Sequence, residues 1–464
     1  MSAFTHAVGA PPPSLLDHSA LARLRPHCGA ARYELAGETF SGTAEFSLPV
    51  SGQARLAFAT AGDRSDQDRA ADLVIEGQLD GVPFTITSPL VHVKHMDESS
   101  RKEGGWSILS PMNAPTRIDY HHGGPAVRAV TLLNNFDYDT GDVVEHDLGW
   151  TIVATPFVAN IGGRGVTFSH TSNAASLRPL AAAGVIHSAS LVECAFSVGA
   201  ESDEDLLAFM TDVAGLCTIA AGGTVGVAML ILLDGDGRAV RRIVPQPVTG
   251  RYRRNGIVND RWLSQFLTST YPTFVAMKQA HGPWAKLASA CGSLDDQPYL
   301  EQKFASAMMA FEFFVRNCLI EHGRKESDVA GLNFNGLIGV ARRDLGWSIP
   351  KHYTAKDRAL IWRNAIVHGN EWPAADAALF RRLFDKWRLF LFRLVLIRLG
   401  YQGEVDSPQR GWASSSPVRD FSEEHNSFEP AGPEDTESWR QFKEHIKAFN
   451  AARQQATGES DGES

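Results

Sequence analysis

The sequence predicts an α+β fold, in which a β-rich, sandwich-like N-terminal domain precedes an all-α helical bundle. Short runs of alternating apolar and polar residues, bounded by Gly, Pro, Asn or Asp, fill residues 31–255 and predict strands. From about residue 256 apolar residues recur at spacings of three and four, which predicts helices. Residues 403–464 are rich in Ser, Pro, Gly and acidic residues, a composition typical of disorder.

The length of 464 residues exceeds what a single core usually fills, so we expect more than one domain. The predicted boundaries are an N-terminal tail (1–30), a β-rich domain (31–255), connecting helices (256–295), a helical domain (296–402) and an acidic, largely disordered tail (403–464).

The clearest strand pair is LVIEGQLDGVPFTITSP at 73–89. Asp80 and Gly81 separate two alternating runs there, and both residue types accept the positive φ angles of a two-residue turn. The segment therefore predicts a hairpin. A helix is also expected at SDEDLLAFMTDVAGL, between strands at 188–199 and 224–233.

Four helices are expected in the C-terminal half, and their short connections predict a bundle. The first spans about 298–322 and carries one apolar stripe; the second spans about 334–345. The third begins with the capping box Thr354-x-x-Asp357 and ends at Gly369, and the fourth runs from Trp372-Pro373 to about 399.

Composition narrows the class of protein. The five cysteines are far apart and odd in number, so they predict neither a disulfide framework nor a metal-binding CxxC pair, and no cofactor is expected. No charged segment followed by an apolar core marks a secretory leader at the N-terminus, and the most apolar stretches are too short or too rich in arginine to cross a bilayer. We therefore expect a soluble, cytoplasmic protein without a membrane partner.

The formal charge of −9 is unevenly distributed. Residues 296–402 hold 16 basic and 11 acidic side chains, a net charge of +5, whereas residues 403–464 hold 6 basic and 13 acidic ones. The cationic helical segment suits an anionic partner such as RNA.

The segment RNAIVHGN carries the candidate chemistry. At about 100° per residue, Asn364 and His368 fall on one face of the third helix, and Arg363 lies beside that face. His368 precedes Gly369 in the last turn, where the helix dipole favours an imidazolium, and a histidine titrates near neutral pH. Cleavage of RNA without a metal needs proton transfer at the 2′-hydroxyl and a cation for the phosphate. His368 can supply the first and the guanidinium of Arg363 the second.

The segment resembles the R-x4-6-H motif of HEPN domains, in which an Asn commonly follows the Arg and a Gly follows the His. The resemblance implies a homodimer or higher homo-oligomer in which two motifs form one RNase site, with Arg363, Asn364 and His368 as its residues. Glu312, in AFEFFVRN of the first long helix, resembles an acidic residue that many members place there to orient the Arg.

Within HEPN proteins the chain is most similar to the ApeA-like group, whose C-terminal HEPN domain follows a β-rich domain. YELAGETFSG and LVIEGQLDGVPFTI carry that part of the similarity. Membership implies a metal-independent endoribonuclease in anti-phage defence, an abortive-infection effector that is kept inactive until a phage-derived trigger reaches the N-terminal domain.

Several patterns have plainer interpretations. Arg316 and His322 repeat the motif in VRNCLIEHG, but Glu312 and Arg316 are spaced for a helix-surface ion pair, so we interpret this pair as structural. DGDG at 234–237 lacks the remaining ligands of a calcium loop and is interpreted as a turn, and IGGRG at 161–165 has neither the lysine nor the spacing of a P-loop. His92, His95, His121 and His122 are interpreted as strand or loop residues. Phe380, Phe384, Trp387, Leu391 and Leu394 form a stripe that we assign to the core and a dimer contact.

Two alternatives to the nuclease stay open. Arg363, Asn364 and His368 can form a hydrogen-bond network between helices, in a non-catalytic HEPN module that only dimerises or binds nucleotide or RNA. The β-rich domain is then the recognition part. In the other alternative, residues 31–250 are a sensor for a phage protein or glycan and restrain the helical domain.

Overall fold

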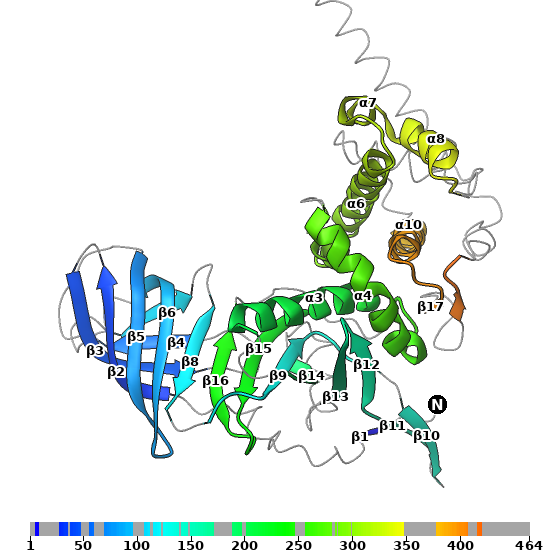
Figure 1. Cartoon of the computed structure of the whole chain (residues 1–464). Coiled ribbons are helices and arrows are strands. Elements are labelled where there is room, and N and C mark those ends of the chain that lie inside the picture. Colours follow the sequence, from blue (N-terminus) through cyan, green and yellow to red (C-terminus); the bar gives the residue numbers. More distant parts are fainter. Residues whose placement is uncertain are drawn as a thin grey trace, which may run out of the picture. The chain divides into compact units, whose positions relative to one another are not determined.

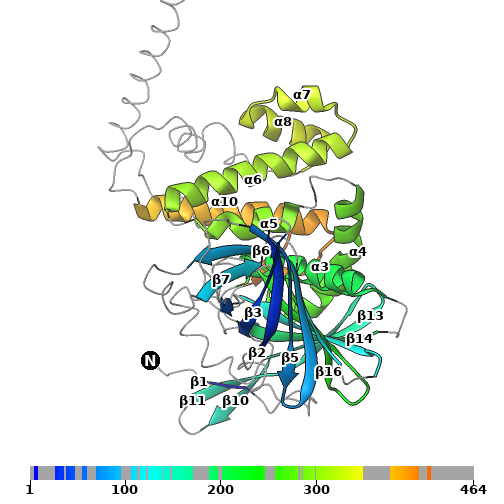
Figure 2. The ribbon, with the colours of Figure 1, turned by 90° about the vertical axis from the view of Figure 1, so that its left-hand side faces the viewer.

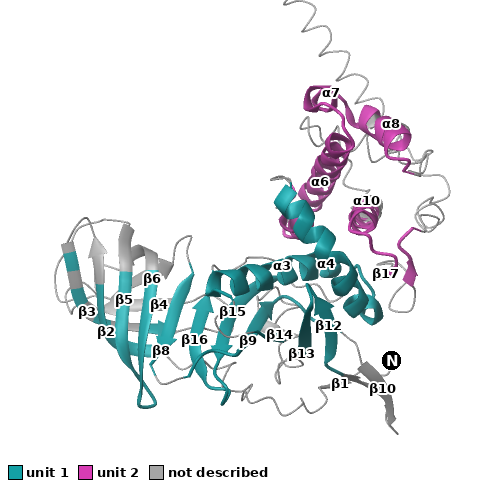
Figure 3. Cartoon of the chain, viewed as in Figure 1, with its two compact units in different colours: residues 1–280 teal, residues 281–464 magenta. Residues whose placement is uncertain are grey.

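The computed structural model divides into two compact units, residues 1–280 (unit 1) and 281–464 (unit 2), each described here by itself (Figures 1 and 3). Strands prevail in the first and helices in the second, so the chain is α+β. The structure describes residues 5–8, 27–35, 38–47, 55–59, 69–95, 106–111, 115–121, 124–138, 141–146, 149–170, 188–196, 201–245, 256–280, 284, 286–297, 299–347, 377–406 and 415–419.

Thirteen strands of unit 1 join into one antiparallel sheet in the order β12-β13-β14-β9-β15-β16-β8-β6-β5-β2-β3-β4-β7. Their bounds are β2 His27–Leu35, β3 Glu38–Ser47, β4 Arg55–Ala59, β5 Arg69–Leu79, β6 Val82–His95, β7 Trp106–Pro111, β8 Thr116–Tyr120, β9 Arg128–Asn134, β12 Phe157–Ile161, β13 Arg164–His170, β14 Ser188–Ala195, β15 Gly226–Leu233 and β16 Ala239–Val244. A separate sheet holds β1 Thr5–Val8, β11 Gly149–Ala154 and β10 Gly141–His146.

The sandwich-like packing that we predicted is replaced by a continuous sheet, one end of which closes into a ring. β6 pairs with β8 along residues 84–87 and with β7 along residues 91–95, so this long strand changes neighbour along its length. The β6–β7 pairing closes β6, β5, β2, β3, β4 and β7 into a ring. Phe46, Ile75 and Phe84 of these strands belong to a core that continues onto β8, β9, β15 and β16. Alternation along a strand shows which face is buried, but it does not show which strand is the neighbour.

The predicted hairpin is confirmed. β5 and β6 pair from Leu79–Val82 outward, and the turn residues Asp80 and Gly81 have φ angles of 51° and 81°. A two-residue turn with two positive φ angles has the twist that antiparallel strands require.

One helix covers the middle of the sheet. α3 (Asp203–Ala221) begins with a capping box, in which Ser202 accepts from the backbone of Asp205 and Asp205 accepts from the backbone of Ser202, and ends at Gly222 in a left-handed conformation. It packs against β15 and β9 (Figure 1). Every residue of β15 is buried, which explains why its sequence is a continuous apolar run.

A second helix of unit 1 lies along the edge strand β12. After the short η2 (Asp260–Trp262), α4 (Leu263–Ala280) reaches the exposed backbone of that strand. Ser264 donates to the carbonyl of Val158 at 2.7 Å, and Thr268 accepts from the N–H of Asn160 at 3.2 Å. The helix thereby satisfies backbone N–H and C=O groups of the edge strand, which could otherwise pair with another strand.

Unit 2 contains the helices α5 Leu287–Gly292, η4 Ser293–Asp295, α6 Leu300–Glu321, α7 Glu326–Ala330, α8 Phe334–Asp344 and α10 Ala377–Arg398. α6 and α8 confirm the helices expected at 298–322 and 334–345, and α10 confirms the described part of the fourth. Figure 2 shows α6 and α10 side by side, in agreement with their contacts. The predicted helix that ends at Gly369 lies outside the described residues.

Both predicted tails contain structure. β1 and the start of β2 fall within residues 1–30. In the C-terminal tail, β17 (Glu404–Asp406) pairs with β18 (Ser415–Pro417), and Val405, Ser416 and Val418 are buried. The polar composition after residue 403 predicts disorder and therefore misses this hairpin. A hairpin held by tertiary contacts needs little apolar sequence of its own.

Candidate functional site

Three of the four candidate site residues, Arg363, Asn364 and His368, lie outside the described residues, which leave out 348–376. α8 precedes this segment in the chain and α10 follows it. The fourth residue, Glu312, lies in the middle of α6, and its side chain is 17% exposed. Its carboxylate Oε2 is 3.8 Å from Nη2 of Arg316, one helical turn further on. The predicted ion pair is therefore confirmed, whereas the predicted role of Glu312 toward Arg363 stays a prediction.

The second copy of the motif, Arg316 and His322, is built into the fold. The guanidinium of Arg316 donates to the carbonyl of Leu332 at 2.9 Å and to the carbonyl of Val329. These bonds tie α7 and the loop that follows it to α6. His322 caps the C-terminal end of α6 and is exposed. Since Arg316 is committed to two backbone oxygens and a carboxylate, it serves structure, as its sequence context indicated.

An aromatic cluster joins α6 to α8 and α10. The ring of Phe311 lies 5.4 Å from Phe334, 5.2 Å from Trp387 and 5.6 Å from Phe390, measured between centroids. Such contacts contribute beyond the apolar area that they bury. Phe384, Trp387, Leu391 and Leu394 of the predicted stripe are buried, which confirms their assignment to the core.

Several arginines of the cationic segment point into the protein. Arg388 and Arg393 of α10 are buried, and burial lowers the pKa of Arg388 to about 10. Arg393 donates at 2.6 Å to both the carbonyl of Pro417 and Oγ of Ser416. Arg398 donates to Glu321 at 2.7 Å. A net charge of +5 in the sequence thus overstates the number of cations that a phosphate backbone can reach.

Unit 1 contains a network of charged side chains that the sequence did not reveal. Oδ2 of Asp203, in the first turn of α3, accepts hydrogen bonds from Arg117 of β8 at 2.9 Å and from Arg241 of β16. Arg241 also donates through Nε to Asp119 of β8. The acidic start of α3 and the charged alternate positions of β8 and β16 were the only signals, and they lie tens of residues apart.

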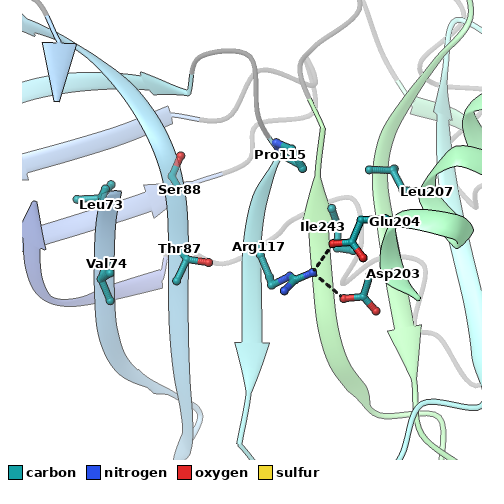
Figure 4. Close-up of a pocket in the computed structure, with 10 residues that line it drawn as sticks. All are labelled: Leu73, Val74, Thr87, Ser88, Pro115, Arg117, Asp203, Glu204, Leu207 and Ile243. Carbon is teal, nitrogen blue, oxygen red and sulfur yellow. Dashed lines mark hydrogen bonds and ion pairs between the residues drawn. The ribbon is translucent and has the colours of Figure 1, made fainter. Parts of the chain in front are cut away.

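A hollow of about 430 Å³ adjoins this network of charged side chains (Figure 4). Figure 4 shows Arg117 directed at Asp203 and Glu204, with Thr87 and Val74 on the neighbouring strands. Arg117 is neutralised by these two carboxylates, at 2.9 and 3.4 Å. Because its charge is already paired, this hollow does not favour a phosphate or an RNA backbone.

The remaining candidates behave as turns or single polar contacts. Asp234 of DGDG accepts from the backbone of Asp236 and Arg238, which confirms a turn. In IGGRG, Gly162 and Gly163 have positive φ angles between β12 and β13. His121 bonds Thr85 at 2.8 Å, while His122 and the side chains of His92 and His95 lie outside the described part.

Among the described residues, no group of three or more His, Cys, Asp and Glu side chains is placed to hold a metal ion. In the same part of the chain, no helix combines the length and the apolar character that a membrane span requires.

Comparison of the chain with protein-family models, with curated proteins and with solved structures gives no match.

Proposed function

We propose that the chain is a metal-independent endoribonuclease of HEPN type, which acts as a two-fold dimer through Arg363 and His368. The observation that carries this proposal is the segment RNAIVHGN, with its Arg-Asn start, its His-Gly pair and the proline-started helix that the sequence predicts after it. Glu312 and Asn364 are proposed to hold the side chain of Arg363 in place.

The chemistry needs no redox partner and no metal. A base, His368 of one of the two subunits, removes the proton of the 2′-hydroxyl, and the oxygen attacks the adjacent phosphorus. The bond from phosphorus to the 5′-oxygen breaks, and that oxygen leaves with a proton from an acid. Arg363 stabilises the charge on the phosphate through two parallel hydrogen bonds. The products are a cyclic 2′,3′-phosphate and a 5′-hydroxyl end, and DNA is not a substrate.

Two features of unit 2 support the choice of this motif. Its helices α6, α8 and α10 share one aromatic core, as expected of a small helical domain. The second copy of the motif, Arg316 and His322, uses its arginine to bond two backbone carbonyls. A residue held in this way cannot also bind a substrate phosphate without releasing them.

The direct experiment is to incubate the purified chain with total RNA in EDTA and to map the new ends. We expect cyclic phosphates at the 3′ ends and 5′-hydroxyls. Cleavage that requires magnesium, or that leaves 5′-phosphates, would contradict the mechanism.

We further propose that unit 1 restrains the nuclease until a phage-derived trigger binds, which makes the protein an abortive-infection effector. Expression of residues 281–464 alone should then change toxicity in cells relative to the full chain. The same comparison with Arg363→Ala in both proteins shows whether the toxicity is nucleolytic. Equal toxicity of both soluble proteins would remove this proposal.

The second candidate is a non-catalytic HEPN module that dimerises or binds nucleotide or RNA, with unit 1 as its recognition part. The hollow beside Asp203 in unit 1 favours it, because concave sites with mixed walls are typical of ligand binding. Protein that binds RNA and leaves no new ends on any RNA would support this candidate. Loss of melting stability in Arg363→Ala and His368→Ala would support it further.

A further inference from the structure

A second hollow of about 570 Å³ adjoins the network of charged side chains in unit 1, and Asp203 lines both hollows. Its walls come from β6, β8, β15, β16, the segment 124–126 and the start of α3. This volume falls in the range that small-ligand sites occupy, which runs from about 300 to about 1,000 Å³. The site belongs to unit 1 and does not depend on the proposed nuclease.

The charge of this hollow disfavours an anion. Asp119, Glu201 and Asp203 line it, and among the described lining residues Arg241 is the sole arginine. Arg241 is bonded to Asp119 and Asp203, and Glu201 is bonded to Arg164 outside the lining. Counting Arg117 and Glu204 as well, the network holds four carboxylates against three guanidinium groups. A phosphate or carboxylate would meet net repulsion here.

The same network leaves acceptor atoms open. Both arginine bonds to Asp203 end on Oδ2, and the bond to Asp119 ends on Oδ1. Oδ1 of Asp203 and Oδ2 of Asp119 accept no hydrogen bond from the residues that the structure describes. Their side chains are 15% and 27% exposed, so both are partly withdrawn from solvent. Half-buried carboxylate oxygens of this kind bind strongest to a charged donor.

Apolar side chains form another part of the wall. Phe196, Leu206, Leu232, Val240 and Pro125 line the hollow, beside the polar side chains of Thr85, Tyr120 and His121. A ligand that satisfies both walls combines a positive donor with a short hydrocarbon stem.

We propose that this hollow binds a cationic head group, an ammonium or guanidinium on a short aliphatic stem, with Asp119 and Asp203 as its acceptors. The head group can belong to a free amine or to a lysine or arginine side chain of a peptide. Both sources share the chemistry that the walls recognise.

Isothermal titration calorimetry on the full chain tests the proposal. The probes are cadaverine and agmatine as free amines, and N-acetyl-lysine amide and N-acetyl-arginine amide as peptide mimics. Inorganic phosphate and glucose serve as contrasting ligands. We expect binding by cationic probes alone. Stronger binding of the amides identifies a peptide side chain as the source, and stronger binding of the free amines identifies a free amine; each supports the site.

Two variants and two matched controls locate the binding. Gly124→Leu adds a bulky side chain at the wall of the hollow without a change in charge, and the fold can accommodate it because a Cβ there meets nothing within 4 Å and the backbone is not left-handed. Asp119→Asn removes one acceptor charge. The controls are Gly235→Leu, another glycine with open space around it, and Asp236→Asn, an exposed carboxylate between β15 and β16 that lines neither hollow.

We expect each variant to lower the affinity about tenfold or more. Asp119→Asn does so because hydrogen bonds between charged groups are strong, and Gly124→Leu because of its bulk. Each control should retain the affinity. Melting curves establish that the variants are folded, and Gly124→Leu decides the matter if Asp119→Asn is not. The proposal is overturned if no cationic probe binds at millimolar concentration. It is equally overturned if Gly124→Leu binds as wild type does, or if phosphate or glucose binds as tightly.

Discussion

Arg316 lies one helical turn beyond Glu312 on α6, with Nη2 of the arginine 3.8 Å from Oε2 of the glutamate. The same guanidinium donates to the carbonyls of Val329 and Leu332. The side chain of Arg316 thus joins the helix that holds Glu312 to the segment that leads into α8. Arg316 belongs to the second copy of the motif, which only resembles the proposed catalytic one.

Arg316→Met should therefore lower stability and spare catalysis. Loss of the hydrogen bonds to two part-buried carbonyls should cost about 2 kcal/mol of unfolding free energy, as measured by denaturant titration. The folded fraction should cleave RNA at the wild-type rate. The matched control is Arg381→Met. This arginine is exposed, pairs with Asp385 and lies 5.8 Å from the ring of Phe384, so its loss should change stability by less than about 0.5 kcal/mol. A folded but inactive Arg316→Met would contradict the structural role.

The hairpin of β17 and β18 should be required for the stability of unit 2. A chain that ends at residue 402 loses the carbonyl of Pro417 and the hydroxyl of Ser416, to which the buried Arg393 donates. Removal of partners from a buried charge costs about 3 kcal/mol or more. A chain that ends at residue 420 keeps both partners and should melt as the full chain does. Equal melting of the two truncated chains would show that the hairpin contributes nothing.

Gly81, in the turn between β5 and β6, should tolerate alanine less well than Gly124 does. Gly81 has a φ of 81°, so Gly81→Ala should cost about 1 kcal/mol of stability, because a Cβ disfavours the left-handed region. Gly124 has no positive φ and open space around it, and Gly124→Ala should be neutral or slightly stabilising. Chemical denaturation of both variants measures the difference. A cost for Gly124→Ala equal to that for Gly81→Ala would be the contrary outcome.

Asp344 should make the stability of unit 2 depend on pH in the acid range. Hydrogen bonds from Arg343 and Arg324 lower the pKa of Asp344 below 3.8. Because the folded pKa lies below the unfolded one, this stabilisation is complete above the unfolded pKa and disappears as the pH falls through the folded pKa. The melting temperatures of wild type and Asp344→Asn should differ at about pH 6 and converge toward about pH 2. Glu326→Gln, an exposed charge on α7, serves as the control for general charge effects.

Local features of this fold followed from the sequence. Asp80 and Gly81 specify their turn through two adjacent residues, and the ion pair of Glu312 and Arg316 follows from their spacing on one helix. The apolar stripe that includes Phe311 and Val315 likewise sets the buried face of α6. Each of these depends on residues within a few positions of one another, which is the range that periodicity and turn chemistry describe.

Features that join distant segments did not follow. Arg117 and Asp203 are separated by 86 positions, and Arg241 and Asp203 by 38. No local pattern marks such partners. For the same reason the closure of β6 on β7 and the two bonds from Arg393 to residues 416 and 417 were missed. The candidate nuclease site is different again, because Arg363 and His368 were chosen from a motif and remain a prediction.

The most direct test of the proposed nuclease compares four proteins on one RNA in EDTA: wild type, Arg363→Ala, His368→Ala and His322→Ala. The last variant removes the exposed histidine of the other motif copy and controls for the loss of an imidazole. We expect wild type and His322→Ala to leave cyclic phosphates at equal rates, and each of the other two to lose cleavage while its melting temperature stays near that of wild type. Undiminished cleavage by both Arg363→Ala and His368→Ala would contradict the account.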